Sequence, residues 1–331
     1  MRKLFAVISM LVFSLTFGTW VQNEAMAKDP IELSMVTFTS LKSTEFTDWK
    51  PLFVDRINEK AKGELVIKVR GGQEVIPMPD QPMAVKRGIV DMGMGPAGFL
   101  KSIVPGADCA RLSRMDQKDE RRIGAVDYLK AQYEKGGLYY LGRAWPVSHN
   151  FFLIFTNKKM MKPEDFKGLK LGSSPSFLGF FKGVGGSPVV VPISEYYTAM
   201  ERGVMDAYAT SMTVFIAMGI YQKTKYVIDH PFYRNPSPLI VNLAKWKSLP
   251  AHLQKIIEDT AIELETTWEP VDKPVQATLR KKAIDEGVEY YKLPPDVEKW
   301  YFTAAYDAAW EDDAKIYPPE VFSKLKGFFK Q

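Results

Sequence analysis

The sequence Ala84-Val-Lys-Arg87-Gly88-Ile-Val-Asp91 returns later in the chain as Ala199-Met-Glu-Arg202-Gly203-Val-Met-Asp206. The two copies share Ala, Arg, Gly and Asp at the same spacing. In each copy an amphipathic run ends at Gly, and two apolar residues then lead to Asp. This order predicts a helix closed by a glycine with positive φ and followed by a short buried strand. Two such corners predict two similar α/β lobes, although the same order also occurs in unrelated proteins.

The first residues have the pattern of a signal peptide. Arg2 and Lys3 precede an apolar run over residues 4–17, and Ala25-Met26-Ala27 is a small-x-small cleavage pattern. We therefore predict a signal peptide over residues 1–27, cut after Ala27, and a mature protein in the periplasm. An uncleaved N-terminal anchor is the alternative. No Cys lies near the predicted cut, which excludes a lipid-modified Cys at the new N-terminus.

Length and composition favour two lobes and argue against nucleic acid as a partner. The chain has 331 residues, which exceeds the size of roughly 250–300 at which one core usually suffices. The net charge is +5, and opposite charges alternate without a long basic block. Cys109 is the single cysteine, so no intramolecular disulfide or thiol-based metal cluster can form. We expect its thiol to be packed rather than reactive.

Apolar periodicity predicts alternating strands and helices in the first half of the chain. Strands are expected over residues 31–37, 64–70 and 90–94, with helical spacing over 46–62 and before Gly88. This β-α-β-α-β order predicts a parallel or mixed sheet with helices on its faces. Later segments predict further strands and helices: strands over 139–145, 151–156 and 189–191, a helix over 121–135, a helix opened by Ser174-Pro175, a long helical region over 249–287 broken near Pro270 and Pro274, and an aromatic helix over 297–317.

Motifs for catalysis, cofactors and metals are missing from the sequence. The three histidines are scattered, without zinc-binding spacing. There is no Gly-x-Ser-x-Gly, no phosphate-binding Gly-x-x-x-x-Gly-Lys and no Asp ladder for calcium. We therefore predict no catalytic residues, no cofactor and no metal, and a protein that binds rather than turns over its ligand. An exported α/β enzyme that uses the same cleft is the alternative from another class.

Several segments, in order, resemble solute-binding proteins of tripartite ATP-independent periplasmic (TRAP) transporters, the DctP-like family. Gly63-Glu-Leu-Val-Ile-Lys-Val is similar to the family's second strand, and Arg87-Gly-Ile-Val-Asp-Met92 to its Gly-x-(Val/Ile)-Asp-Met corner. Lys162-Pro-Glu-Asp-Phe-Lys-Gly-Leu-Lys170 and Ser194-Glu-Tyr-Tyr-Thr-Ala-Met-Glu-Arg-Gly-Val-Met-Asp206 resemble two later family segments. The matches cover nearly the whole chain after the predicted signal peptide.

The resemblance implies an α/β, two-lobed periplasmic binding protein with a mixed sheet in each lobe and a long helix that spans both lobes. We expect lobe I to contain residues 28–149 and about 236–275, and lobe II residues 150–235 and about 276–331. The family captures one small molecule in the interlobe cleft and delivers it to TRAP membrane permease subunits. The implied protein is a monomer without enzymatic activity. A ligand-sensing partner of a signalling receptor is the alternative within binding proteins.

The departures from the family pattern concern the ligand. The Arg that normally follows Gly-Leu-Lys-(Ile/Leu) and binds the ligand's carboxylate is Gly172 in this chain. A second Arg of some members aligns with Phe152, and a family Asn aligns with Thr210. On the first lobe, polar contacts of sialic-acid-binding relatives fall loosely on Phe38 and Pro96. A buried carboxylate without a cation is costly, so an atypical, aromatic or apolar ligand is expected.

Aromatic residues cluster near the implied cleft and suit such a ligand. Core packing is the alternative for each of them, since 13% of the chain is aromatic. The aromatic candidates are Phe38, Trp145, Phe151, Phe152, Tyr208 and Tyr233. The complete set of predicted ligand-binding residues is Phe38, Pro96, Trp145, Phe152, Gly172, Ser174, Tyr208, Thr210 and Tyr233.

A competing hypothesis keeps an anionic ligand. Ser174 and Ser176 lie where a helix is predicted to begin, and free main-chain N–H groups with hydroxyls can hold an anion without Arg. Arg143 or Arg234 could instead reach the cleft from another side. The sequence leaves these possibilities open.

Overall fold

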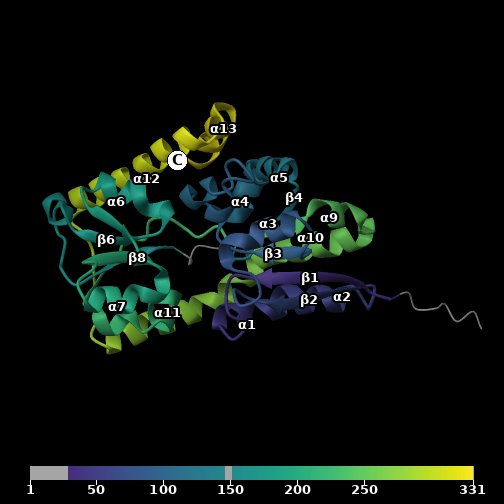
Figure 1. The fold of residues 1–331 in the computed structure, drawn as a ribbon, viewed down its shortest axis with the longest axis horizontal. Helices are drawn as coiled ribbons and strands as arrows, with labels where there is room; N and C mark the ends of the chain where they lie inside the picture. Colours follow the sequence, from purple (N-terminus) through teal and green to yellow (C-terminus); the bar gives the residue numbers. More distant parts are fainter. Residues whose placement is uncertain (1–28, 146–150, 331) are drawn as a thin grey trace, which may run out of the picture.

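The computed structural model describes residues 29–145 and 151–330, which form two β-sheets side by side with helices packed around them (Figure 1). The predicted signal peptide, residues 1–27, lies outside the described residues. Among the described residues, no helix has the length and apolar character needed to cross a bilayer.

The first sheet has five strands, and the middle of the sheet is completed late in the chain. The strand order is β2-β1-β3-β10-β4, and β10 alone runs antiparallel to its neighbours. The strands are β1 (Ile31–Thr37), β2 (Leu65–Gly71), β3 (Met92–Met94), β4 (Leu138–Arg143) and β10 (Pro238–Asn242).

The second sheet repeats this arrangement with one extra strand. Its order, β7-β6-β8-β5-β9-β11, matches that of the first sheet, with β5 as the antiparallel strand in the place of β10. The prediction of two similar lobes is therefore confirmed. The strands are β5 (Leu153–Thr156), β6 (Lys170–Ser173), β7 (Ser187–Val190), β8 (Ala207–Thr210), β9 (Tyr226–Ile228) and β11 (Glu289–Tyr291).

The repeated sequence forms the same corner in both lobes. Helix α3 (Gln81–Lys86) ends before Gly88, whose φ is +71°, and helix α7 (Tyr196–Glu201) ends before Gly203, whose φ is +66°. These left-handed conformations are the ones that glycine adopts without strain. Strands β3 and β8 then begin directly after the Asp of each copy.

That Asp ties its strand to the neighbouring parallel strand in each lobe. The Asp91 carboxylate accepts bonds from the main-chain N–H and the hydroxyl of Ser34 on β1, at 2.8 and 2.7 Å. The Asp206 carboxylate accepts the main-chain N–H of Lys170 on β6, at 2.9 Å. The shared Asp is therefore a device for fixing strand register, which explains why it recurs.

The predicted lobe-spanning helix is present. Helix α10 (Ala251–Thr267) packs against β4 in the first lobe, and α11 (Glu269–Asp285) packs against α8 (Met212–Ala217) in the second. Trp268 between them has helical φ and ψ of −78° and −44°. Pro270 lies in the first turn of α11, where a missing N–H is tolerated, and Pro274 lies inside the helix.

Two predicted helices are interrupted in the structure. Residues 46–62 form α1 (Thr44–Lys50) and α2 (Arg56–Lys60) joined by a π-helical turn at Pro51–Asp55, because Pro51 cannot donate a main-chain hydrogen bond. The region 121–135 is divided by Gly124, with φ of +82°, into α4 and α5. The remaining helices are α4 (Gln117–Arg122), α5 (Ala125–Lys135), α6 (Leu178–Gly183), α9 (Leu243–Ser248), α12 (Pro295–Ile316) and α13 (Pro319–Phe329).

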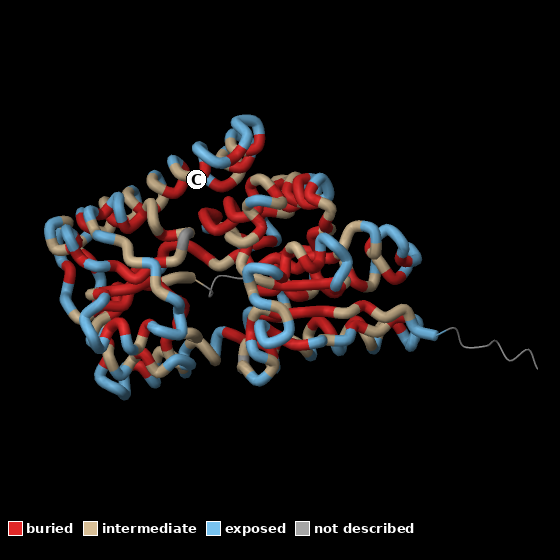
Figure 2. The backbone as a smooth tube through the Cα atoms, in the orientation of Figure 1, coloured by how far each residue is buried: buried red, intermediate tan, exposed pale blue. Residues whose placement is uncertain are grey.

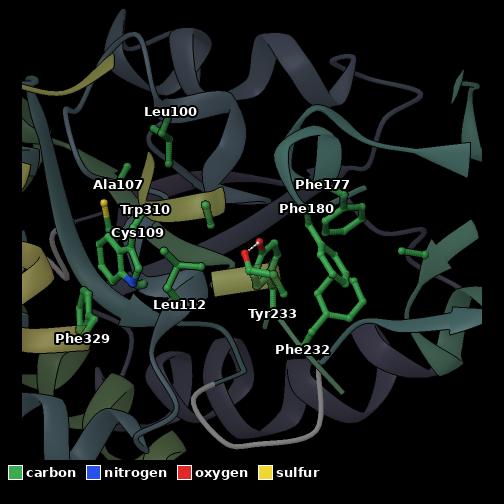
Figure 3. Close-up of a cluster of buried hydrophobic side chains, with 14 of the residues drawn as sticks. Leu100, Ala107, Cys109, Leu112, Phe177, Phe180, Phe232, Tyr233, Trp310 and Phe329 are labelled. Carbon is green, nitrogen blue, oxygen red and sulfur yellow. Dashed lines mark hydrogen bonds between the residues drawn. The ribbon is translucent and has the colours of Figure 1, made fainter. Parts of the chain in front are cut away.

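The apolar core lies along the strands and the inner helix faces, while the outer faces of the helices are exposed (Figure 2). One cluster lies between the first sheet and α10, and another between the second sheet and α8. A third cluster joins both lobes beneath α12 and α13 (Figure 3). Its labelled members include Leu112 from the first lobe, Phe180 from the second and Trp310 from α12. The C-terminal helices therefore share a core with both lobes.

A buried ion pair anchors α12 to the first lobe. The Arg111 guanidinium donates to both carboxylate oxygens of Asp313, at 2.8 and 3.0 Å. Arg111 is 3% exposed and Asp313 is fully buried. A bidentate pair of this kind has good geometry. The buried Asp108 carboxylate also lies 3.2 Å from the Arg111 guanidinium, so Arg111 is shared between two carboxylates.

We predict that Asp313→Ala lowers the free energy of unfolding by roughly 3 kcal/mol, because the buried Arg111 loses its bidentate partner and keeps only the Asp108 carboxylate as a counterion among the described residues. Urea unfolding followed by circular dichroism measures this. The matched control is Asp312→Ala, since the neighbouring carboxylate is half-exposed and pairs with Lys315 at the surface. That control should change stability by less than about 0.5 kcal/mol. Equal effects of the two variants would contradict the anchoring role.

Candidate functional site

The parallel strands of the two sheets end toward each other, and β1 points at the second sheet (Figure 1). In α/β proteins ligands bind outside the carboxyl ends of such strands. In the first lobe β1, β3 and β4 end at Thr37, Met94 and Arg143. Three predicted site residues follow these ends directly or within two residues: Phe38, Pro96 and Trp145. The fold thus brings them to one edge.

Phe38 and Trp145 form an aromatic pair at this edge. Their ring centroids lie 5.4 Å apart with the planes at 82°, an edge-to-face contact. Phe38 is half-buried, and Trp145 is 4% exposed. The indole N–H of Trp145 has no hydrogen-bond partner among the described residues. The pair therefore offers an apolar surface with one free donor.

Pro96 lines a small apolar pocket at the same edge, together with Pro238 and Ile240. Gln81 also lines it and was not predicted. The Gln81 amide donates to the Thr37 and Ile76 carbonyls, both at 3.0 Å, and its buried Oε1 has no partner within the described part of the chain. In the sequence Gln81 is an ordinary polar residue at a helix start, so only its burial identifies it.

The second lobe presents an equivalent edge. Strands β6 and β8 end at Ser173 and Thr210, and the antiparallel strand β5 begins here. Phe152, Ser174 and Thr210 are therefore brought together at one edge. The Phe152 ring meets the Phe177 ring edge-on, with centroids 4.7 Å apart. This gives the second lobe an aromatic pair of its own.

Ser174 lies at the start of the short 3₁₀ helix Pro175–Phe177, as predicted for an N-terminal position. Its side chain makes no capping bond, and its carbonyl accepts the Ser173 hydroxyl at 2.8 Å. The turn leads without a break into α6 (Leu178–Gly183). An anion site at this helix start remains a prediction.

The two lobes touch at the rims of these edges. A Cβ placed on Gly98 in the first lobe would lie 3.3 Å from the Ser176 hydroxyl in the second. Glu45 on α1 bonds to Thr213 on α8, and burial, reinforced by the nearby Asp272 carboxylate, raises the pKa of Glu45 to about 7. The two lobes therefore contact each other at two places, Gly98 with Ser176 and Glu45 with Thr213.

Gly172 is buried in β6, and its surroundings have no room for a side chain. A Cβ at this position would lie 2.4 Å from the Met205 sulfur and 3.0 Å from the Tyr208 Cβ. Met205 therefore fills the space into which an Arg would have to extend. The packing around Gly172 therefore excludes a longer side chain at this position, and the correspondence with the family's Arg remains a prediction.

Tyr208 and Tyr233 are fully buried, and packing accounts for both. The Tyr208 hydroxyl lies 2.8 Å from that of Thr224, and the Tyr233 hydroxyl donates to the Ala305 carbonyl on α12. Burial raises the pKa of both phenols well above the usual range. Their hydroxyls are engaged within the protein, so neither one presents a free polar group to a ligand.

The two arginines of the competing hypothesis are also placed beside the first edge. Arg143 is the last residue of β4, and Arg234 precedes β10. Both side chains are buried, at 1% and 4% exposure.

No group of three or more His, Cys, Asp or Glu side chains suited to a metal occurs in the described ranges. Cys109 is buried, and burial raises the pKa of its thiol, as expected for a packed cysteine. The site as described is a set of aromatic surfaces and hydrogen-bond donors, which suits binding.

We predict that Gly172→Ala lowers the free energy of unfolding by about 1–3 kcal/mol, because the new methyl group overpacks against Met205. In a Met205→Ala background, which is itself less stable, the same Gly172→Ala change should cost less, because the clashing sulfur is gone. Gly327→Ala on α13 is the control, since a Cβ there has nothing within 4 Å. Chemical denaturation of the wild type and these variants provides the comparison, and an unchanged Gly172→Ala variant would show that the space is open.

Comparison with known proteins agrees with this geometry. The sequence profile of the bacterial extracellular solute-binding protein family 7, DctP, matches residues 35–315. The chain is 28% identical over 221 residues to the 2,3-diketo-L-gulonate-binding periplasmic protein YiaO of Escherichia coli K12, covering 64% of this chain and 66% of YiaO.

Solved structures of TRAP periplasmic solute-binding proteins share the fold. The protein from Marinobacter aquaeolei VT8, in an apo open state, superposes with a TM-score of 0.80 at 17% identity, over 91% of this chain and 100% of that chain. The protein from Desulfovibrio salexigens with bound orotic acid gives 0.78 at 19% identity, over 90% and 98%. The predicted two-lobed fold is confirmed, while the lobe boundaries and the ligand-binding residues remain predictions. The chain belongs to the DctP family of bacterial extracellular solute-binding proteins, family 7.

Proposed function

We propose that this protein captures one small organic ligand with an aromatic or apolar body between its lobes and delivers it to a TRAP-type membrane permease. The observation that carries the proposal is the pair of aromatic contacts on the two facing edges. Phe38 with Trp145 and Phe152 with Phe177 would cover opposite sides of a flat or apolar ligand.

The packing at Gly172 supports the same ligand class. Because Met205 fills the space beside Gly172, no cationic side chain can extend from this position of β6 to hold a carboxylate. Ligand contacts with both edges would favour the closed arrangement of the lobes, and the permease would recognise that closed form.

We further propose that the working protein is a monomer in the periplasm, formed by cleavage after Ala27. The family consists of binding proteins rather than enzymes. We also propose that the protein has no enzymatic activity. Mass spectrometry of candidate ligands before and after incubation with the protein tests this absence of activity, because a changed ligand mass would reveal turnover.

A thermal-shift screen tests the ligand class, with aromatic acids, neutral aromatics, sugars and dicarboxylates as the compounds. A ligand at 100 times its dissociation constant should add about 2.7 kcal/mol to stability. We expect the stabilising compounds to be aromatic or apolar, and uptake of such a compound to fall in cells that lack this protein. Stabilisation by sugars or dicarboxylates alone would contradict the proposal.

For a stabilising compound, we predict that Phe152→Leu weakens binding about five- to thirty-fold, because about 1–2 kcal/mol of ring contact is lost. Isothermal titration calorimetry gives the dissociation constants. Phe302→Leu is the matched control, since Phe302 is also a half-buried ring but lies on α12, away from both edges. Equal weakening in both variants would point to a general loss of packing.

A further inference from the structure

Two buried arginines lie together where the chain crosses between the lobes. The main-chain N–H of Ala144, next to Arg143, donates to the Ser237 carbonyl at 2.8 Å, and Arg143 is paired with Pro238 across the strands. Arg234 forms a bridge with Phe151, so described residues on both sides of the gap at 146–150 pair with the returning segment. The guanidinium carbon of Arg234 lies 5.1 Å from the centre of the Phe151 ring.

Neither guanidinium has enough partners. Arg143 bonds to Glu120 and to the Tyr140 hydroxyl, and Arg234 donates one bond to the Met115 carbonyl at 2.6 Å. The Nε and Nη1 groups of Arg143 and the Nε and Nη2 groups of Arg234 have no hydrogen-bond partner among the described residues. A buried donor without a partner is unfavourable, and four such donors on two side chains form an exceptional group.

Neighbouring polar groups share this condition. The Trp145 indole N–H and the Ser237 hydroxyl are buried and also lack partners in the described ranges. Trp145 lies two residues after Arg143, and Ser237 lies three residues after Arg234. These two donors are therefore close to the arginines along the chain, on the segments that connect the two sheets.

The local charge is unbalanced as well. Glu120 is the buried carboxylate that faces both arginines, while Asp116, which also attracts Arg234, is exposed. Burial and the neighbouring Arg143 lower the pKa of Arg234 to about 10. That value is still above neutral pH, so both arginines are charged. Among the described residues the three buried charged groups here, Arg143, Arg234 and Glu120, carry a surplus of one positive charge, and Oε1 of Glu120 also lacks a hydrogen-bond partner. A bound anion with one negative charge would balance it.

We propose that Arg143 and Arg234 form an anion site that binds a single carboxylate group of the ligand. The ligand is then a monocarboxylate with an aromatic or apolar body. The carboxylate lies at the crossing connections, and the body extends between the aromatic pairs. This inference rests on the proposed function only in placing the ligand between the lobes. The site lies apart from Gly172, on residues of the crossing connections rather than on β6.

Bromide is a probe that needs no knowledge of the ligand. In crystals of the wild-type protein soaked in sodium bromide, we expect an anomalous peak within hydrogen-bonding distance of both guanidinium groups. The peak should be lost in Arg234→Gln crystals. A peak that lies elsewhere, or no peak at all, would overturn the proposed site.

Matched acids and amides test the carboxylate. Benzoate, phenylacetate and nicotinate are compared with benzamide, phenylacetamide and nicotinamide by thermal shift and calorimetry. We expect an acid to bind at least tenfold more tightly than its amide, since charged hydrogen bonds to a buried guanidinium are strong. Arg234→Gln should abolish this preference. Equal binding of acid and amide, or a preference that survives Arg234→Gln, would overturn the inference while leaving the proposed function intact.

A purely structural role makes the opposite prediction for the ligand-free protein. If Arg234 only supports the fold, Arg234→Gln lowers the melting temperature; if Arg234 is held ready for an anion, the variant is as stable as the wild type or more so. Arg280→Gln is the control, since Arg280 has a complete bidentate partner in Asp229 and lies on α11. Should Arg234→Gln not fold, Arg234→Lys keeps the charge with fewer donors and should bind acids more weakly. Failure of the wild type to bind any compound would count against the proposed function instead.

Discussion

One aspartate in each lobe fixes the arrangement on which the rest of the molecule depends. By accepting main-chain and side-chain bonds from the next strand, Asp91 and Asp206 hold pairs of parallel strands in register. Parallel strands bring their carboxyl ends to the same edge. Every residue that we assign to the ligand region follows or adjoins such an end. The repeated sequence is thus important for function because it sets the direction in which these strands end, although none of the predicted ligand-binding residues lies within it.

The region between the lobes combines two kinds of surface. Aromatic rings line both edges, whereas positive charge is concentrated on the crossing connections, beside Glu120. At Gly172, where the family resemblance predicts an Arg, Met205 packs against the glycine and leaves no space for a longer side chain. Apolar packing and buried charge are therefore separated in this lobe pair. Such a separation suits a ligand that is itself divided into an apolar part and a charged part.

Much of the fold could be predicted from the sequence because its signals are local. Alternation predicted β1 to the residue, and the glycines of the repeated sequence predicted both corners. The π-helical turn at Pro51 and the division at Gly124 were missed because apolar spacing continues through both positions.

The site was less predictable, because burial and partners depend on contacts between distant segments. Phe38, Trp145 and Phe152 were identified as candidates from their position in the sequence, and the structure places them at the edges. Tyr208 and Tyr233 were predicted on the same grounds, as aromatic residues, but both side chains are buried. Their hydroxyls make hydrogen bonds with the Thr224 hydroxyl and the Ala305 carbonyl. Gln81 gave no signal, since its unpartnered oxygen arises only when α3 packs on the sheet. The incomplete hydrogen bonding of Arg143 and Arg234 is likewise visible only in three dimensions.

The position of β10 has a consequence for how the chain reaches this structure. Strand β10 completes the middle of the first sheet, yet it is synthesised after the whole second sheet except β11. Until residue 242 has emerged, β3 and β4 have no strand between them, and the helix that covers this sheet, α10, follows later still. The first lobe thus cannot close its sheet by itself as synthesis proceeds. Contacts between such distant segments form slowly. In a nascent chain of this topology the first sheet stays incomplete for most of the synthesis. This leaves time for chaperones to bind the chain while it is unfolded.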